Sequence, residues 1–135
     1  MAFRYLLDTN VLSELARRPH GEVAQRIGEV GAEAVCTNLI VAGEMRFGAA
    51  KSGSEKLRAQ VEAILDAVEV LSLDPPVDQA YAAIRHALER EGQPIGPNDL
   101  WIAAHARSLD LALVTANLAE FQRVPHLAVE SWLGR

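Results

Sequence analysis

Cysteine is almost absent from this chain of 135 residues, in which Cys36 stands alone. A single thiol cannot form an internal disulfide, and it argues against a zinc cluster built on cysteine. Cys36 lies in an apolar run, where we expect it to pack in the core. A chain without disulfides suits a reducing compartment, so we expect a cytoplasmic protein.

Long apolar runs are also missing, and no stretch approaches the length of a membrane span. The first twelve residues carry Arg4, Asp8 and Asn10 where the apolar part of a signal peptide would lie. We therefore expect neither secretion nor a membrane partner.

Aromatic residues make up only 5% of the chain, although half of it is hydrophobic, so aliphatic packing is expected to dominate the core. The length suits one domain over residues 1–135. An excess of basic residues is lacking too: 13 basic and 18 acidic residues give a net charge of −5. This balance counts against a nucleic-acid binder, but less against a metal enzyme, because bound cations cancel local carboxylate charge.

What the sequence does contain is an alternation of short apolar runs with amphipathic segments. Strands are expected at 3–7, 33–37, 69–73, 111–115 and, more weakly, 128–130. Helices are expected at 10–17, 22–30, 38–51, 54–68, 77–91 and 99–109, with Asn10, Asn38 and Asn98 as caps. The pattern predicts an α/β fold, a three-layer sandwich with a parallel sheet of four or five strands. Ligands of such folds gather beyond the carboxyl ends of the strands.

Two aspartates stand where this topology gathers ligands. Asp8 directly follows the first strand, and Asp99 opens a helix behind Gly96-Pro97-Asn98. Each has a plain structural interpretation as well as a metal-binding one. Turns and caps favour aspartate, and the helix dipole favours an acid in the first turn.

Glu44 carries a different signal. Ile40, Gly43, Glu44 and Phe47 recur at helical spacing, which predicts Glu44 on the apolar stripe of its helix. An ionised carboxylate there is unfavourable unless it is paired or binds a metal. A salt bridge to an arginine and a place in a metal site are therefore its two interpretations.

A parallel sheet would bring Asp8, Glu44 and Asp99 to one rim. Carboxylates about 4 Å apart repel by roughly 4 kcal/mol at an effective dielectric constant of about 20. A cluster of three therefore requires protonation, arginine partners or a cation. Magnesium fits best, because it takes few carboxylates, keeps waters and recruits substrate phosphates.

Asn117 follows the strand at 111–115 much as Asp8 follows the first strand. Asn117-x-x-Glu120 also resembles a capping box at the start of a short helix. That interpretation explains both residues without any function.

Four segments together resemble the PIN-domain toxins of VapC type. They are LDTNVLS at 7–13, GE at 43–44, GPNDLWIAAHA at 96–106 and VTAN at 114–117 with Glu120 and Phe121. Their order and spacing match over essentially the whole chain. The resemblance implies a PIN-like fold and an endoribonuclease that uses Mg²⁺, with Mn²⁺ as a substitute. It also implies an RNA substrate, a cognate antitoxin and a homodimer.

The resemblance assigns the catalytic acids to Asp8, Glu44 and Asp99, with Asp8 and Asp99 as metal ligands. The fourth acidic position of the family is often aspartate, whereas this chain has Asn117. Thr9, Asn10 and Thr115 are supporting residues that hold waters or orient carboxylates. Glu120 is a candidate carboxylate in place of Asn117, but the capping role is preferred for it.

Two other functions compete with the nuclease. In a silent PIN-like binding module, Asn117 would mark lost activity. A phosphoacceptor signalling domain would need a lysine after a late strand, and the chain has only Lys51 and Lys56. The helices within 38–68 carry apolar positions that suggest a dimer or antitoxin surface.

Overall fold

A computed structural model describes residues 2–134, so the two ends of the expected domain, Met1 and Arg135, lie outside the described residues. Its centre is one parallel sheet with the strand order β3-β2-β1-β4-β5. The strands are β1 (Tyr5–Leu7), β2 (Val35–Asn38), β3 (Glu69–Leu71), β4 (Ala112–Val114) and β5 (Val129–Glu130). The predicted α/β fold with a parallel sheet is confirmed.

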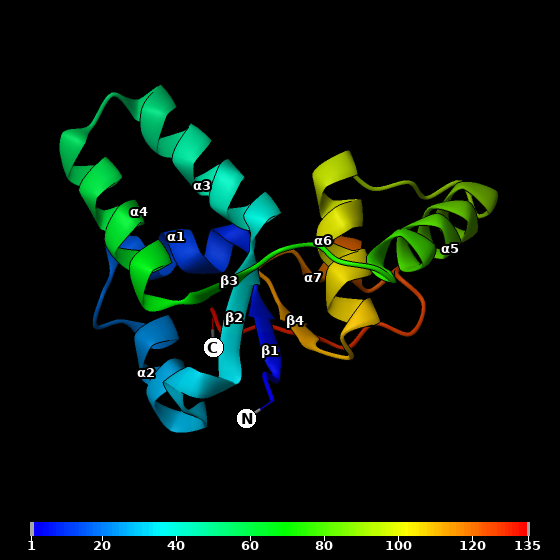
Figure 1. Cartoon of the computed structure of the whole chain (residues 1–135), viewed down its shortest axis with the longest axis horizontal. Coiled ribbons are helices and arrows are strands. Elements are labelled where there is room, and N and C mark those ends of the chain that lie inside the picture. Colours follow the sequence, from blue (N-terminus) through cyan, green and yellow to red (C-terminus); the bar gives the residue numbers. More distant parts are fainter. Residues whose placement is uncertain (1, 135) are drawn as a thin grey trace.

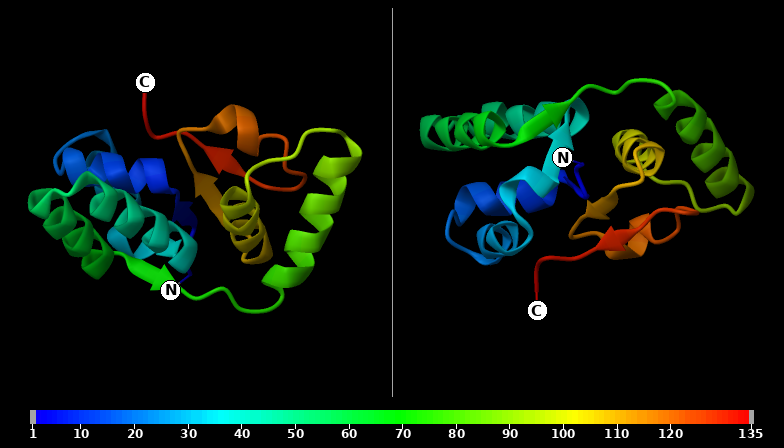
Figure 2. Two further views of the ribbon diagram at one scale, coloured as in Figure 1. Left: turned by 90° about the horizontal axis from the view of Figure 1, so that it is seen from above. Right: turned by 60° about the horizontal axis from the view of Figure 1, so that its bottom comes forward.

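Helices cover both faces of this sheet, which makes three layers (Figures 1 and 2). On one side lie α1 (Thr9–Arg17), α2 (Glu22–Val30), α3 (Leu39–Ser52) and α4 (Glu55–Ala67). On the other lie α5 (Val77–Arg90), α6 (Pro97–Ser108) and the short α7 (Leu118–Phe121). The chain therefore changes sides between β3 and β4, as a right-handed connection requires when the strand order reverses.

The boundaries follow local signals in most places, and one strand is shifted. Ser54 caps α4 by accepting from the amide of Leu57, and Gly53 ends α3 in a left-handed conformation. The strand expected at 33–37 begins later. Residues Ala32–Ala34 form a short 3₁₀ turn, and the strand runs from Val35 to Asn38.

Of the three expected caps, only Asn38 serves as one, because its side chain accepts from the amide of Val41 at 2.9 Å. Helix α1 is capped by Asp8, which leaves Asn10 inside the first turn. Helix α6 starts at Pro97 after Gly96, because proline suits the first helical position. Asn98 therefore lies within the helix, and its side chain makes no capping hydrogen bond.

The core is aliphatic, and β1 and β4 are its centre. Leu6, Leu7, Leu113 and Val114 have no exposed surface. Cys36 is buried as expected. Because their side chains are fully packed, β1 and β4 form a rigid support for the residues that follow their carboxyl ends.

His105 of α6 is packed in the interior rather than exposed in a site. Its Nδ1 lies 3.0 Å from Nδ2 of Asn38, the residue that caps α3. Burial lowers the pKa of His105, so the ring is a neutral structural link between α6 and α3. Within residues 2–134, no helix is both long and apolar enough to cross a membrane.

Candidate active site

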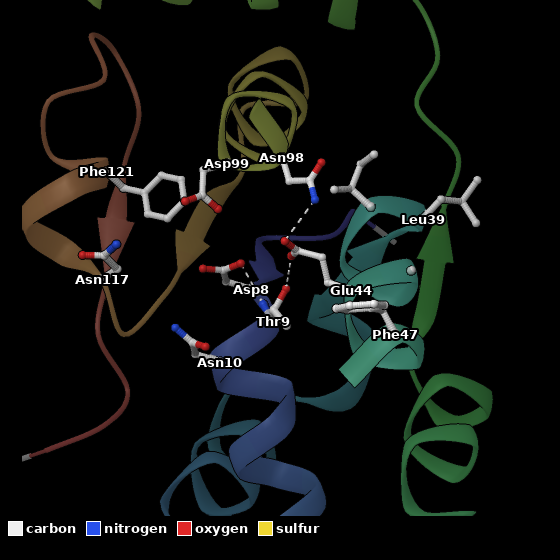
Figure 3. A pocket seen from close by; sticks show the side chains of 12 residues that line it. Asp8, Thr9, Asn10, Leu39, Glu44, Phe47, Asn98, Asp99, Asn117 and Phe121 are labelled. Atoms are coloured by element: carbon white, nitrogen blue, oxygen red, sulfur yellow. Dashed lines mark hydrogen bonds between the residues drawn. The ribbon is translucent and has the colours of Figure 1, made fainter. Parts of the chain in front are cut away.

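An open pocket of about 680 Å³ lies beyond the carboxyl ends of β1 and β4. It sits where the strand connections reverse direction, as expected for an α/β sheet. The starts of α1 and α6, the first two turns of α3 and the start of α7 form its walls (Figure 3). The predicted residues that line it are Asp8, Thr9, Asn10, Glu44, Asp99 and Asn117.

Asp8 is fixed at the bottom of this pocket and is only 5% exposed. Its Oδ1 accepts from the amide of Thr9 at 2.7 Å, and its Oδ2 accepts from Oγ1 of Thr115 at 2.8 Å. Burial raises the pKa of Asp8, whereas the bonds from Thr115 and Thr9 oppose that rise. The capping interpretation of Asp8 is therefore correct, and the capping aspartate also faces the pocket.

Glu44 faces the pocket as well, although the expected reason was wrong. The buried side of α3 is formed by other residues, namely Val41, Ala42, Met45 and Ala49. Glu44 is half-buried, and Phe47 on the same stripe is 68% exposed. The apolar stripe thus turns toward the pocket and away from the core.

The alternative for Glu44, a salt bridge to arginine, is not formed with any arginine that the structure describes. Arg46 points elsewhere and pairs with Glu62 at 2.9 Å. Glu44 instead accepts from two neutral groups, Oγ1 of Thr9 at 2.5 Å and Nδ2 of Asn98 at 3.2 Å.

Asp99 lies in the first turn of α6 and faces the other acids across the pocket (Figure 3). Burial, followed by Glu120, Asp8 and Glu44, raises the pKa of Asp99 to about 7. A helix N-terminus by itself favours the ionised form. Burial and the neighbouring carboxylates act on Asp99 in the opposite direction and favour its protonated form.

Glu120 belongs to this acidic cluster, and the capping role expected for it is wrong. Helix α7 begins after Asn117 as predicted, but no capping box closes it. The backbone N–H of Asn117 donates to Oγ1 of Thr115 at 3.0 Å, and the side-chain Nδ2 of Asn117 donates to Oε2 of Glu120 at 2.5 Å. Thr115 accepts the hydrogen bond from the backbone N–H of Asn117 that Glu120 was expected to accept. The Glu120 carboxylate is therefore free to approach Asp99.

The cluster has no basic partner in the part of the chain that the structure describes. No lysine or arginine among residues 2–134 forms an ion pair with Asp8, Glu44, Asp99 or Glu120. In the same part of the chain, no group of three or more histidine, cysteine or acidic side chains is arranged so that it could hold a metal ion. The polar side chains that face the pocket are carboxylates, a hydroxyl and amides, which suit a hard cation that keeps part of its water shell.

Sequence reasoning missed Asn98 and the apolar rim of the pocket. Asn98 had been assigned to capping, and its bond to Glu44 joins residues 54 positions apart. Leu39, Ile40, Gly43, Phe47 and Phe121 complete the lining. Helical spacing placed Ile40 and Phe47 on the stripe of Glu44, but spacing alone does not show that this stripe faces a pocket.

Comparison with known sequences gives a consistent picture. The PIN domain family model matches residues 5–127. Ribonuclease VapC2 of Haemophilus influenzae is 37% identical over 131 residues, covering 96% of this chain and 98% of that protein. The tRNA(fMet)-specific endonuclease VapC of Salmonella typhimurium is 35% identical over 130 residues, covering 96% of this chain and 98% of that protein.

Solved structures show the same likeness. VapBC2 from Rickettsia felis, bound to a DNA fragment from its promoter, contains a chain with a TM-score of 0.89 and 30% identity. The match covers 98% of the present chain and 100% of that one. DNA-bound VapBC from Salmonella typhimurium gives a TM-score of 0.87 at 32% identity, covering 97% and 99% of the two chains.

Proposed function

This chain belongs to the PIN-domain family, among the relatives of the VapC ribonucleases, and we propose that it is a divalent-metal-dependent endoribonuclease acting as a toxin. The observation that carries the proposal is the pocket in which Asp8, Glu44 and Asp99 face one another without a basic partner among residues 2–134. Such a pocket attracts a cation and, through it, a phosphodiester.

Asp8 and Asp99 are the proposed metal ligands, and Glu44 completes the catalytic set. When bound, a divalent ion, Mg²⁺ or Mn²⁺, supplies water of lowered pKa and stabilises charge on the phosphodiester oxygens. Asp8 is already oriented by two hydrogen bonds, so its carboxylate needs no rearrangement.

The charge of the Asp99 carboxyl depends on whether a cation occupies the pocket. With a pKa of about 7, its carboxyl holds a proton in part of the neutral pH range. Burial and the neighbouring carboxylates, Glu120 first among them, favour this proton, which lowers the repulsion in the cluster. Cation binding and loss of this proton are therefore coupled.

The supporting residues act through these acids. Thr9 and Thr115 orient Asp8, and Thr9 also orients Glu44. Asn10 and Asn117 line the same pocket and offer neutral oxygen atoms for water or substrate.

A cognate antitoxin is the proposed regulatory partner. A smaller groove of about 230 Å³ runs between α1, α3 and α4 and is lined by small residues such as Ser13, Gly48 and Ala49. It shares Thr9 and Glu44 with the acidic pocket. A peptide seated in this groove would therefore reach Glu44 directly. The solved relatives are toxin–antitoxin complexes, which supports this partner.

A homodimer is proposed on the exposed apolar side chains at the pocket rim. Leu39 is 54% exposed and Phe47 is 68% exposed, and both lie on α3. Large apolar side chains that cluster on a surface commonly mark an interface.

The alternative of a silent binding module rests on Asn117, which supplies an amide where the family often has aspartate. The retained acids and the approach of Glu120 to Asp99 favour the nuclease. A phosphoacceptor domain is disfavoured, because no lysine lines the pocket.

Cleavage of total RNA by the purified, antitoxin-free chain tests the proposal. Wild type should cleave in Mg²⁺ or Mn²⁺ and not in EDTA, and Asp99→Asn should lose at least about 100-fold in rate. Asp78→Asn is the matched control, since Asp78 stands in the first turn of α5 as Asp99 does in α6. If folded wild type shows no metal-dependent cleavage, the silent binding module becomes the better assignment.

A further inference from the structure

Glu44 is the acid of the pocket that most needs external support. Its side chain has three rotatable bonds and is only half-buried, so packing does not fix its conformation. Immobilising a glutamate forfeits up to about 2 kcal/mol of rotamer freedom. The shorter Asp8, by contrast, is buried and held on both oxygens. A defined position for the Glu44 carboxylate therefore depends on its hydrogen-bond partners.

Two donors from two different helices supply that support (Figure 3). Oε1 of Glu44 accepts from Oγ1 of Thr9 at the start of α1. Oε2 accepts from Nδ2 of Asn98 in the first turn of α6. A carboxylate offers only acceptors, so the amide must present its nitrogen to Glu44. Both oxygens are thereby engaged, and the carboxylate is held between the elements that carry Asp8 and Asp99.

Asn98 has no competing structural task. It does not cap α6, whose cap position is Gly96. Its side chain is exposed, so it adds little to the core. Within residues 2–134, Glu44 is the only side-chain hydrogen-bond partner found for it. Its contact with Glu44 is therefore the one role that the structure shows for this side chain.

A neutral amide is chemically suited to this position. An arginine would neutralise Glu44 and compete with a divalent cation for its charge. A carboxylate at position 98 would remove the donor and add a like charge beside Glu44 and Asp99. An amide orients Glu44 and leaves the negative charge of the pocket intact.

We propose that Asn98 is a positioning residue that holds the Glu44 carboxylate toward Asp8 and Asp99. The inference rests on the proposed nuclease function. Asn98 acts through Glu44, so its effect exists only while Glu44 can accept its hydrogen bond. Partners of this kind typically contribute 10- to 100-fold to metal affinity or activity, which sets the expected scale at about 10-fold.

A double-mutant cycle tests the inference, with Mn²⁺ affinity measured by titration calorimetry and RNA cleavage measured on the same preparations. Asn98→Ala should weaken Mn²⁺ binding and cleavage by about 10-fold while the melting temperature stays within about 2 °C. Asn98→Asp should be more damaging than Asn98→Ala, because it adds repulsion. In a Glu44→Ala background, which removes the acceptor, Asn98→Ala should have no further effect on either measurement. Gln79→Ala is the matched control, an exposed amide in the first turn of α5.

The outcomes separate this inference from the proposed function. If wild type binds Mn²⁺ and cleaves RNA, and Asn98→Ala equals Gln79→Ala in both measurements, only the role of Asn98 is overturned. Additive effects of Asn98→Ala and Glu44→Ala would also overturn it. A folded wild type that neither binds Mn²⁺ nor cleaves RNA would overturn both conclusions.

Discussion

The hydroxyl of Thr115 donates a 2.8 Å hydrogen bond to Oδ2 of Asp8, although 107 residues separate the two in sequence. The bond joins the residues that follow β4 and β1, the paired central strands of the sheet. Thr115 also accepts from the amide of Asn117 and so ties the start of α7 to the same point. Strand pairing in the core thereby fixes the orientation of a carboxylate in the pocket.

Replacing Thr115 by valine keeps the side-chain shape but removes this hydroxyl. Asp8 then loses a buried donor, so unfolding free energy should fall by about 1–3 kcal/mol and cleavage by about 10-fold or more. Chemical denaturation and RNA cleavage measure the two effects. Thr115→Ser, which keeps the hydroxyl, should retain most of both; equal losses in the two variants would speak against the hydrogen bond as the cause.

The pKa of Asp99 makes the stability of the metal-free protein depend on pH. Its value is 3.8 in the unfolded reference and about 7 when folded, so the folded state binds the extra proton between these limits. Stability contributed by this group is full below pH 4 and is lost as pH rises through 7. Asp99→Asn should therefore stabilise the EDTA-treated protein by about 1–2 kcal/mol at pH 8, allowing for solvent screening, and by little at pH 4. Urea unfolding at both pH values checks this, and a stabilisation independent of pH would contradict it.

Metal binding should carry the opposite pH dependence. A cation binds the ionised form of Asp99, so protons compete with it below pH 7. The increase in melting temperature caused by Mg²⁺ should be larger at pH 8 than at pH 6. The difference should vanish in Asp99→Asn, because this variant removes the competing proton together with a metal ligand; persistence of the difference in that variant would assign it to another group.

The exposed rim of the pocket should affect association but hardly folding. Phe47 is 68% exposed, so Phe47→Ala should change unfolding free energy by less than about 0.5 kcal/mol. Self-association measured by sedimentation should weaken at least about tenfold, as expected for an aromatic interface residue. An unchanged sedimentation profile would remove Phe47 from the proposed dimer surface.

The sequence predicted the architecture well because apolar periodicity and turn residues are local signals. Helix α2 falls on the expected residues 22–30, and all five expected strands are present. The acids Asp8, Glu44 and Asp99 were predicted to meet, because parallel strands present their carboxyl ends at one edge.

The missed details depend on contacts between distant segments. Pro97 moves the start of α6, which changes Asn98 from an expected cap into a partner of Glu44. Thr115 satisfies the amide of Asn117, which frees Glu120 from capping. Helical spacing identified the stripe that holds Glu44, but only the packed helices show that it faces a pocket.

Titration of Mn²⁺ into wild type and Asp8→Asn at pH 8, without RNA, tests the central claim most directly. Wild type should bind Mn²⁺ in the acidic pocket, and Asp8→Asn should bind at least about tenfold more weakly, because it removes a pre-oriented charged ligand. Equal affinity in the two proteins, or no binding by folded wild type, would contradict the assignment of this pocket as the metal site of a nuclease.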